Sequence, residues 1–232
     1  MILIKLILAH LIGDFFLQPK KWIVEKEKQK WKSPYLYIHA LLHFILILLI
    51  LWDISYWHIA ILIAFSHLLI DVVKVQLQTK ETRSLWFGTD QILHLLVLVS
   101  VWMLFWNETV VQLPGESFWI ILTSLIFLTY PASYIMMNIM NRWSGQIDTE
   151  NEGSLDNAGM YIGMLERIFI YIAILTGHMQ IIGFLLAAKS VFRFGDLTRA
   201  KNRKLTEYIL IGTLLSFLIA IAAGFATVQF MN

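Results

Sequence analysis

Long apolar stretches recur along this chain and are separated by shorter segments that carry most of the charge. A helix needs about 20 apolar residues to cross the hydrocarbon core of a bilayer, within a range of about 17–25. Windows of that length predict eight membrane-spanning helices, near residues 2–18, 36–52, 57–74, 90–106, 117–139, 159–176, 179–194 and 207–229. The seventh is the weakest, because Lys189 and Arg193 interrupt it, and a re-entrant segment is the alternative there. The pattern predicts an all-α, polytopic transmembrane bundle.

The composition agrees with this interpretation. Of the 232 residues, 58% are hydrophobic and 15% charged, and the mean hydropathy is +0.69, which leaves too little polar surface for a water-soluble globular protein. The net charge of +2 gives no reason to expect nucleic acid as a partner, and the lack of cysteine excludes thiolate metal ligands and disulfides. We expect one integral membrane domain over 1–232, made of a four-helix half (1–106) and a supporting half (117–232). Its expected partners are membrane lipids, and homo-oligomerisation stays open.

Basic residues gather in alternate loops. Sixteen of the eighteen Lys and Arg residues lie in segments 19–35, 74–89, 140–158 and 189–206. Because short cytoplasmic loops carry an excess of Lys and Arg, these four segments are predicted to be cytoplasmic and both termini to lie outside. The first span lacks the basic start and the small-residue cleavage site of a signal peptide, so we expect it to be retained. The predicted location is the bacterial cytoplasmic (inner) membrane.

Each of the first four predicted spans carries two ionisable residues four positions apart. The pairs are His10 with Asp14, His39 with His43, His67 with Asp71, and Asp90 with His94. Residues four apart share one face of a helix, and the alternating direction of the spans puts all four pairs at a similar depth near the cytoplasmic side. Because ionisable groups at membrane depth are costly, they indicate function. We expect one cluster of five histidines and three aspartates.

Imidazole and carboxylate groups are the ligands that Zn, Mn and Fe(II) prefer, with Zn the first expectation here. A catalytic tetrahedral ion needs only three protein ligands and a water, so eight residues predict either two ions or a mixture of ligands, bases and orienting groups. Asp14 or Asp90 is then the expected catalytic base, and Gln18 and Gln91 are expected to orient the ligands. A proton relay and plain helix packing are the alternatives.

The second half of the chain has a different polar set. Glu166 lies inside a predicted span and needs a cationic partner, which Arg167 or Lys189 can supply. Together with Lys74 and Arg193, these residues are expected to form a substrate-binding clamp for a phosphate or carboxylate. The alternative is that the basic residues only anchor their helices at the cytoplasmic face.

Three segments carry a resemblance to a known family: HLIGDFFLQ (10–18), SHLLIDVVK (66–74) and TDQILH (89–94). They resemble an uncharacterised bacterial family of polytopic membrane proteins, a domain of unknown function. The stretches IGMLERIFI (162–170), AAKSVFRF (187–194) and EYILIGTLLS (207–216) are also similar to it. More remotely, the spacing of His and Asp on membrane helices resembles that of membrane-bound metal-dependent hydrolases, which are themselves likened to zinc phospholipases.

Taken together, these features predict a membrane-embedded, metal-dependent hydrolase that acts at the cytoplasmic leaflet on a phosphorylated or lipid-like substrate. A transporter or channel for a divalent cation or for protons is the first alternative, because the same cluster could hold an ion transiently. A scaffold or sensor stabilised by a structural metal is the other.

Overall fold

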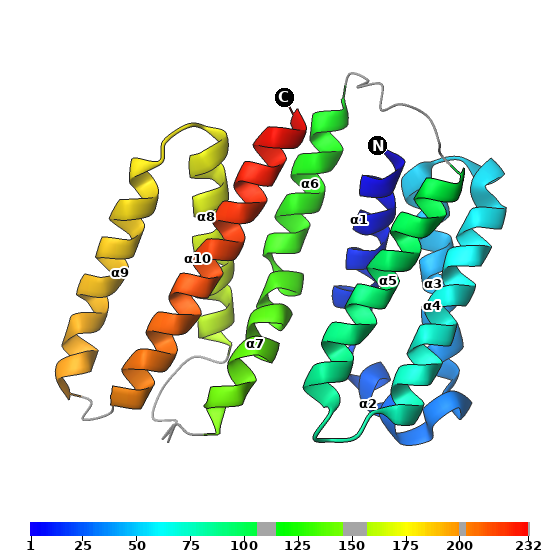
Figure 1. Ribbon diagram of the computed structural model, residues 1–232, viewed down its shortest axis with the longest axis horizontal. Helices are drawn as coiled ribbons and strands as arrows, with labels where there is room; N and C mark the ends of the chain where they lie inside the picture. The colour runs from blue at the N-terminus through cyan, green and yellow to red at the C-terminus, as the bar shows by residue number, and fades with distance from the viewer. Residues whose placement is uncertain (106–114, 146–156, 200–202, 232) are drawn as a thin grey trace. The chain divides into compact units, whose positions relative to one another are not determined.

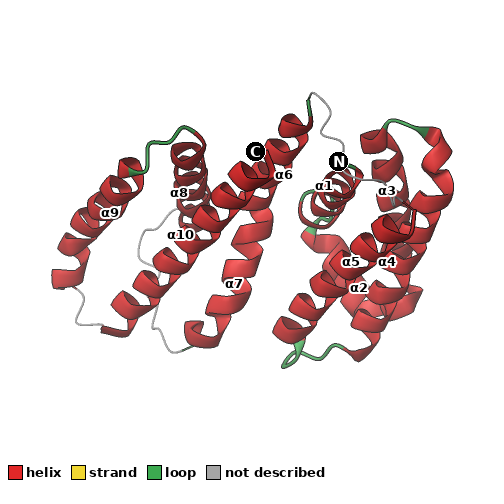
Figure 2. Ribbon diagram, turned by 45° about the horizontal axis from the view of Figure 1, so that its top comes forward, coloured by secondary structure: helices red, strands yellow, loops and turns green. Residues whose placement is uncertain are grey.

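A computed structural model describes residues 1–105, 115–145, 157–199 and 203–231 of the chain. Within these ranges the chain forms helices joined by short turns, and no strand occurs (Figure 2). The helices fall into two compact units, Met1–Ile126 and Phe127–Asn232. The predicted single domain with halves 1–106 and 117–232 stays a prediction.

Four long helices of the first unit form a bundle, and a short one covers one end of it (Figure 1). The long helices are α1 (Ile2–Phe15), α3 (Pro34–Leu51), α4 (Trp57–Leu77) and α5 (Arg83–Phe105). Helix α1 packs against α3 and α5, and α4 packs against α3 and α5. The covering element is α2 (Lys20–Gln29), which continues into the 3₁₀ turn η1 (Lys30–Lys32).

Local sequence explains where these helices begin and end. Pro19 lies between α1 and α2, where it cannot continue a helix, and the two helices are bent by 79° there. Pro34 opens α3, a position that needs no backbone N–H. Trp52 ends α3 in the left-handed region, with φ 57°, and Asp53 then accepts a hydrogen bond from the backbone N–H of Ser55 to start the turn η2 (Ile54–Tyr56).

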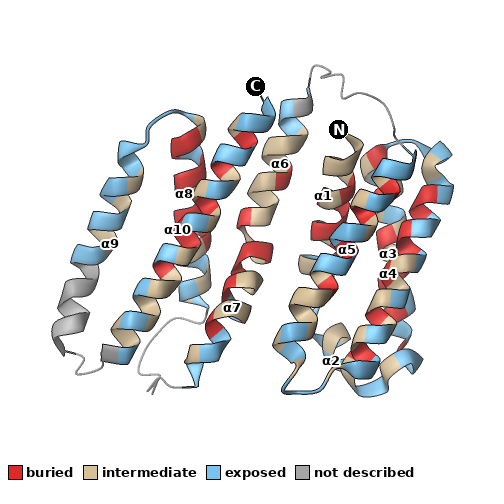
Figure 3. Ribbon diagram, in the orientation of Figure 1, coloured by how far each residue is buried: buried red, intermediate tan, exposed pale blue. Residues whose placement is uncertain are grey.

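The first unit has one apolar end and one polar end. Away from α2, its core is closed by apolar side chains of α1, α3, α4 and α5: Leu6, Ala9, Ile47, Leu51, Ile59, Ala60, Ile63, Leu98 and Val101. These lie among the buried residues of Figure 3. Large apolar side chains also face outward, including Leu49, Phe65 and Leu96, each more than half exposed. Outward-facing apolar residues of this kind suit a lipid environment.

The second unit is built mainly on the packing of α8 (Ala158–Leu175) against α10 (Arg203–Met231). Helix α7 (Tyr130–Ser144) contacts both, and α9 (Gln180–Arg199) contacts α8. Helix α7 follows α6 (Glu116–Leu128) after a break at Thr129, where Pro131 at the start of α7 cannot donate a backbone hydrogen bond.

Six described helices are long and apolar enough to cross a membrane, or seven if the bent pair of α1 and α2 counts as one span. Such helices are those of a membrane-embedded protein. The predicted number of about eight spans is therefore not confirmed. The difference lies in α9, whose apolar part, Gln180–Val191, is shorter than a bilayer requires, and in α1, which has only 14 residues.

Candidate metal centre

All eight predicted ligands meet in the first unit, at the end of the bundle nearest α2. They come from four helices, His10 and Asp14 from α1, His39 and His43 from α3, His67 and Asp71 from α4, and Asp90 and His94 from α5. Seven of them are buried, and the side chain of the eighth, Asp14, is only 9% exposed. Four-residue spacing on each helix turns both members of a pair into the bundle, which is why the sequence pattern located them.

Asp14 lies at the middle of the cluster. Its Oδ1 atom is 3.0 Å from Nε2 of His43, 3.1 Å from Nε2 of His67 and 3.2 Å from Nε2 of His39. The Nε2 atoms of His39 and His43 are 3.3 Å apart. A carboxylate oxygen has two lone pairs, and two imidazole nitrogens that face each other cannot both donate. Hydrogen bonds alone therefore cannot satisfy all of these nitrogen and oxygen atoms.

Four buried polar atoms of the cluster have no hydrogen-bond partner among the described residues. They are Nδ1 of His39, Nδ1 of His67, Oδ1 of Asp90 and Nε2 of His94. Buried polar groups are nearly always paired, and an unpaired one costs about 1–3 kcal/mol. The concentration of unpaired atoms at one place indicates a site that has spare capacity for a ligand.

Gln91 links α5 to α1 and orients His10. Its amide nitrogen donates to Oδ2 of Asp14 at 2.8 Å, so its amide oxygen faces Nε2 of His10 at 3.2 Å. Because that oxygen only accepts, Nε2 of His10 carries the proton and Nδ1 keeps its lone pair. Gln91 therefore fixes the orientation of His10 and Asp14, while its predicted role at a metal site stays a prediction.

Two lysines donate hydrogen bonds to the Oδ2 atoms of two aspartates. Lys74 donates to Oδ2 of Asp90 at 2.7 Å, and Lys26, from the covering helix α2, donates to Oδ2 of Asp71 at 2.6 Å. Lys26 is only 4% exposed. Sequence reasoning missed this residue, because nothing along the chain distinguishes it from the other lysines of segment 19–35. Only the fold-back of α2 over the bundle end brings it to Asp71.

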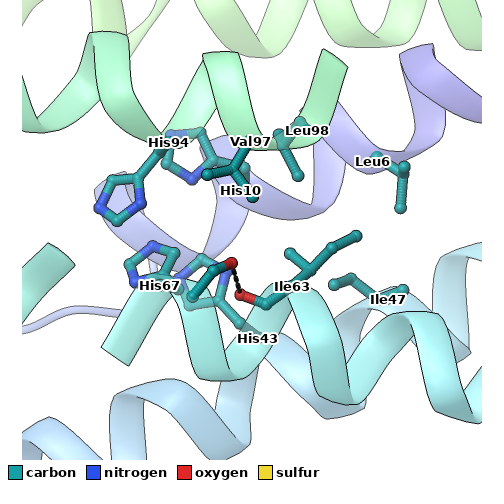
Figure 4. Close-up of a pocket in the computed structure, with 10 residues that line it drawn as sticks. Leu6, His10, His43, Ile47, Ile63, His67, His94, Val97 and Leu98 are labelled. Atoms are coloured by element: carbon teal, nitrogen blue, oxygen red, sulfur yellow. Dashed lines mark hydrogen bonds between the residues drawn. The ribbon is translucent and has the colours of Figure 1, made fainter. Parts of the chain in front are cut away.

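A small cavity of about 10 Å³ adjoins the cluster, room for about one water molecule. Four imidazoles line one end of it, those of His10, His43, His67 and His94, as Figure 4 shows. Apolar side chains close the other end: Leu6, Ile47, Ile63, Val97 and Leu98. A water molecule there would be in contact with the histidines and shielded by the apolar core.

The geometry fits a metal ion. Bonds of about 2.0–2.1 Å from a tetrahedral ion to its ligands put the ligand atoms about 3.3–3.4 Å apart. The distances from Oδ1 of Asp14 to the three imidazole nitrogens, 3.0–3.2 Å, are slightly shorter than this, so a small outward movement of the side chains would admit an ion. One ligand atom each from His10, Asp14, His43 and His67 lie within 4.8 Å of one another, and the same holds for His39, His67 and Asp71, and for Asp14, Asp90 and His94.

Gly13 leaves the space that the imidazole ring of His43 occupies. A Cβ atom on Gly13 would lie 2.7 Å from Nε2 of His43 and closer still to Cε1, a distance that real Cβ atoms do not show. The helix α1 therefore needs glycine here for the imidazole of α3 to reach Asp14. The motif HLIGD contains this glycine, but its role depends on a close approach between two helices that the sequence does not reveal.

The predicted clamp residues divide between the two units. Lys74 belongs to the cluster of the first unit, and Glu166, Arg167 and Lys189 belong to the second. Lys189 donates to Glu166 at 2.7 Å, so Lys189 is the partner of Glu166. The side chain of Arg193 lies outside the described side chains, and the predicted clamp stays a prediction.

Arg167 is held by four acceptors. Its Nε donates to the backbone oxygen of Leu128 and its Nη1 to Ser216, while its Nη2 donates to Ser133 and to the backbone oxygen of Thr129. Two of these acceptors are carbonyls at the break between α6 and α7. Because four of its five N–H donors are used within the unit, Arg167 supports the break in the helix and has little capacity left for a substrate anion.

Comparison with protein-family models gives a match over the first half of the chain. Residues 2–122 match the family model described as "Protein of unknown function (DUF3307)". The match contains all eight residues of the cluster, together with Lys26, Lys74 and Gln91, and ends before the second unit. No curated protein and no solved structure matches the chain. The resemblance to membrane-bound metal-dependent hydrolases therefore stays a prediction.

Proposed function

The chain belongs to the DUF3307 family, whose description gives no activity, and we propose from its polar cluster that it is a membrane-embedded, metal-dependent hydrolase. The observation that carries this proposal is the convergence of His43 and His67 on one oxygen of Asp14, beside a cavity for a single water. Three protein ligands and one water are the pattern of catalytic zinc sites, whereas structural sites are closed by four protein ligands.

Oδ1 of Asp14 and Nε2 of His43 and of His67 would hold the ion, and Zn is preferred over Mn or Fe(II) for an imidazole-rich set. His39, whose Nε2 lies 3.2 Å from the same oxygen, orients the carboxylate. This role makes Asp14 a ligand, in place of the predicted base. A bound ion lowers the pKa of its water to about 7 and polarises the bond under attack.

The charges of the cluster favour a cation and then an anionic substrate. Asp71 pairs with Lys26 and Asp90 with Lys74, while Asp14 contacts the histidines, so with neutral histidines the formal charge of these groups is −1. One divalent ion changes this to +1, a sign that suits a phosphorylated lipid or another phosphate ester. Without a metal, one protonated histidine would balance the charge, and metal titration separates these two states.

His10 is the group placed to move the proton. Gln91 fixes its Nε2–H, which leaves the lone pair of Nδ1 to accept a proton from the water in the cavity. The water oxygen forms the new bond to phosphorus and the ester P–O bond breaks. His10 then returns the proton to the leaving oxygen, so the step balances without a further reactant.

The polar end of the bundle is the cytoplasmic end in this proposal, because α2 and the loop after α4 carry the basic residues. The N-terminus is then outside, the C-terminus is also outside if α9 crosses the membrane as the sequence predicts, and the membrane is the bacterial inner membrane. The nine apolar core residues named above close the other end of the bundle, so the described residues of the first unit offer an ion no polar path across it. This speaks for a hydrolase over a transporter.

The experiment is a turnover screen with purified, metal-loaded protein in nanodiscs. Phospholipids and phosphorylated lipid carriers are offered, and release of phosphate or headgroup is measured with and without a chelator. Metal-dependent turnover that His43→Ala abolishes and His58→Ala keeps would support the proposal; His58 is exposed near the start of α4. Metal-dependent flux into liposomes without turnover would replace it with transport.

The orientation has its own test. The chain has no cysteine, so Lys28→Cys and Asp53→Cys introduce single labelling sites at exposed positions on either side of α3. An impermeant thiol reagent on intact cells should label position 53 and leave position 28 unlabelled. The reverse pattern would invert the proposed topology and put the cluster near the outer leaflet.

A further inference from the structure

Two buried atoms of α5 lie within ion-pair distance of each other at the edge of the cluster but do not form a hydrogen bond. Oδ1 of Asp90 and Nε2 of His94 are 3.3 Å apart, and neither makes a hydrogen bond within the described residues. Asp90 is 1% exposed and His94 is 3% exposed, so water from outside does not satisfy them. The proposed hydrolytic ion on Asp14, His43 and His67 does not use either atom. A ligand that accepts both electron pairs would.

Asp14 supplies a third possible ligand beside Asp90 and His94. One of its carboxylate oxygens lies within 4.8 Å of ligand atoms of both Asp90 and His94, although Asp14 also belongs to the first ligand set. A carboxylate has two oxygens and can join two ions, and paired catalytic ions usually lie about 3.5–4 Å apart. The rings of His67 and His94, one from each set, stack with centroids 3.7 Å apart, so the two sets are in direct contact.

The surroundings orient these atoms for an ion. Lys74 and Gln91 both donate to Oδ2 of Asp90, at 2.7 Å and 3.3 Å, which leaves Oδ1 as the oxygen free to bind. Oδ1 of Asp71 lies 3.7 Å from Nε2 of His94, while Lys26 holds the other oxygen of Asp71. Hydrogen bonds to the second oxygen of a ligating carboxylate are typical of metal sites in proteins.

We propose that the centre is dinuclear, with a second divalent cation bound by Asp14, Asp90 and His94 and with Asp14 shared between the two ions. This rests on the proposed metal centre and deepens it. Two ions change the formal charge of the cluster from −1 to +3. A charge of +3 selects a doubly negative phosphate monoester over a neutral carboxylic ester, because only the former offsets it. Asp90 is then a metal ligand, and the proton stays with His10.

The test is the stoichiometry and coupling of bound metal in the full-length protein. Chelator-treated protein in detergent is titrated with Mn²⁺, bound metal is counted by elemental analysis, and the paramagnetic resonance spectrum is recorded. We expect two equivalents and the broadened spectrum of two coupled ions. Asp90→Asn, which keeps the shape and the Lys74 contact, should bind one equivalent with an uncoupled spectrum.

The outcomes separate the second ion from the first. His58→Ala, outside the cluster, should keep two equivalents, and His94→Ala should bind one. A different outcome is a parent protein that binds one equivalent, which His43→Ala removes and Asp90→Asn keeps. That result would contradict the second ion and leave the proposed single-ion hydrolase standing. If the parent binds none, both are wrong. Helical circular dichroism of each variant identifies a misfolded one, and Asp90→Asn is the conservative variant that then decides.

Discussion

Both units bury charged side chains, yet they treat them differently. In the second unit, Glu166 has Lys189 as its partner, and Arg167 uses four of its five donors on neighbouring oxygens. In the first unit, the cluster around Asp14 keeps four buried polar atoms unpaired and an adjoining cavity. Charged groups whose hydrogen-bonding capacity is taken up by neighbouring protein atoms stabilise the fold. Unused capacity at one place is what a ligand site requires, because a ligand must find partners there.

The largest effect that tests this comparison comes from removing a ligand. His67→Ala should reduce the affinity for Zn²⁺ by about a hundredfold to a thousandfold, since a structural zinc site of four ligands is worth about 10–16 kcal/mol, or about 2.5–4 kcal/mol for each ligand. His58→Ala, on the same helix α4 but exposed, should bind as the parent does. Isothermal titration of chelator-treated protein measures both. Equal affinity in the two variants would make the cluster a packing feature.

The next effect is on stability. Arg167→Ala removes four hydrogen bonds and leaves carbonyls at the α6–α7 break without their donor, which should cost about 3 kcal/mol of unfolding free energy. Arg167→Lys keeps the charge but loses the planar fork, so we expect it to fall between Ala and the parent. Thermal unfolding in detergent measures the order, and the metal content should not change. A loss of metal in Arg167→Ala would link the two units functionally.

A smaller effect should come from crowding the cluster. Gly13→Ala places a methyl group against the ring of His43, and the displaced imidazole should weaken metal binding about tenfold, the size expected for disturbing the support of a ligand. Gly88→Ala is the matched control, a helical glycine of α5 with nothing within 4 Å of the added carbon. The ratio of the two dissociation constants is the measurement. A ratio near one would mean that His43 does not bind the ion.

The smallest effect concerns the ion pair of the second unit. A double-mutant cycle with Glu166→Gln and Lys189→Met should give a coupling of about 1 kcal/mol, because the pair is in contact but the lysine side chain is 24% exposed. Unfolding of the four proteins of the cycle in detergent supplies the numbers. A coupling of zero together with lost turnover in both single variants would instead return these residues to the predicted substrate clamp.

Periodicity and composition were enough for the helical membrane architecture and for the eight polar residues, because a four-residue spacing on a helix fixes which side chains share a face. They were not enough for the number of spans. Helix α9 looked long enough when its polar residues were included, but its apolar part ends at Val191. The choice of Lys189 as the partner of Glu166 also could not be read from the chain, since Arg167 is adjacent in sequence.

The sequence by itself determined which chemical groups this protein buries and at what level of the bundle they lie, since helical spacing and alternating direction are local properties. Only the tertiary structure decided what each group does. It brought Lys26 back over the bundle to Asp71, left room for His43 beside Gly13, and left Oδ1 of Asp90 without a hydrogen bond, 3.3 Å from Nε2 of His94. The physical reason is that pairing and close approach depend on contacts between helices distant in sequence, which no local pattern encodes.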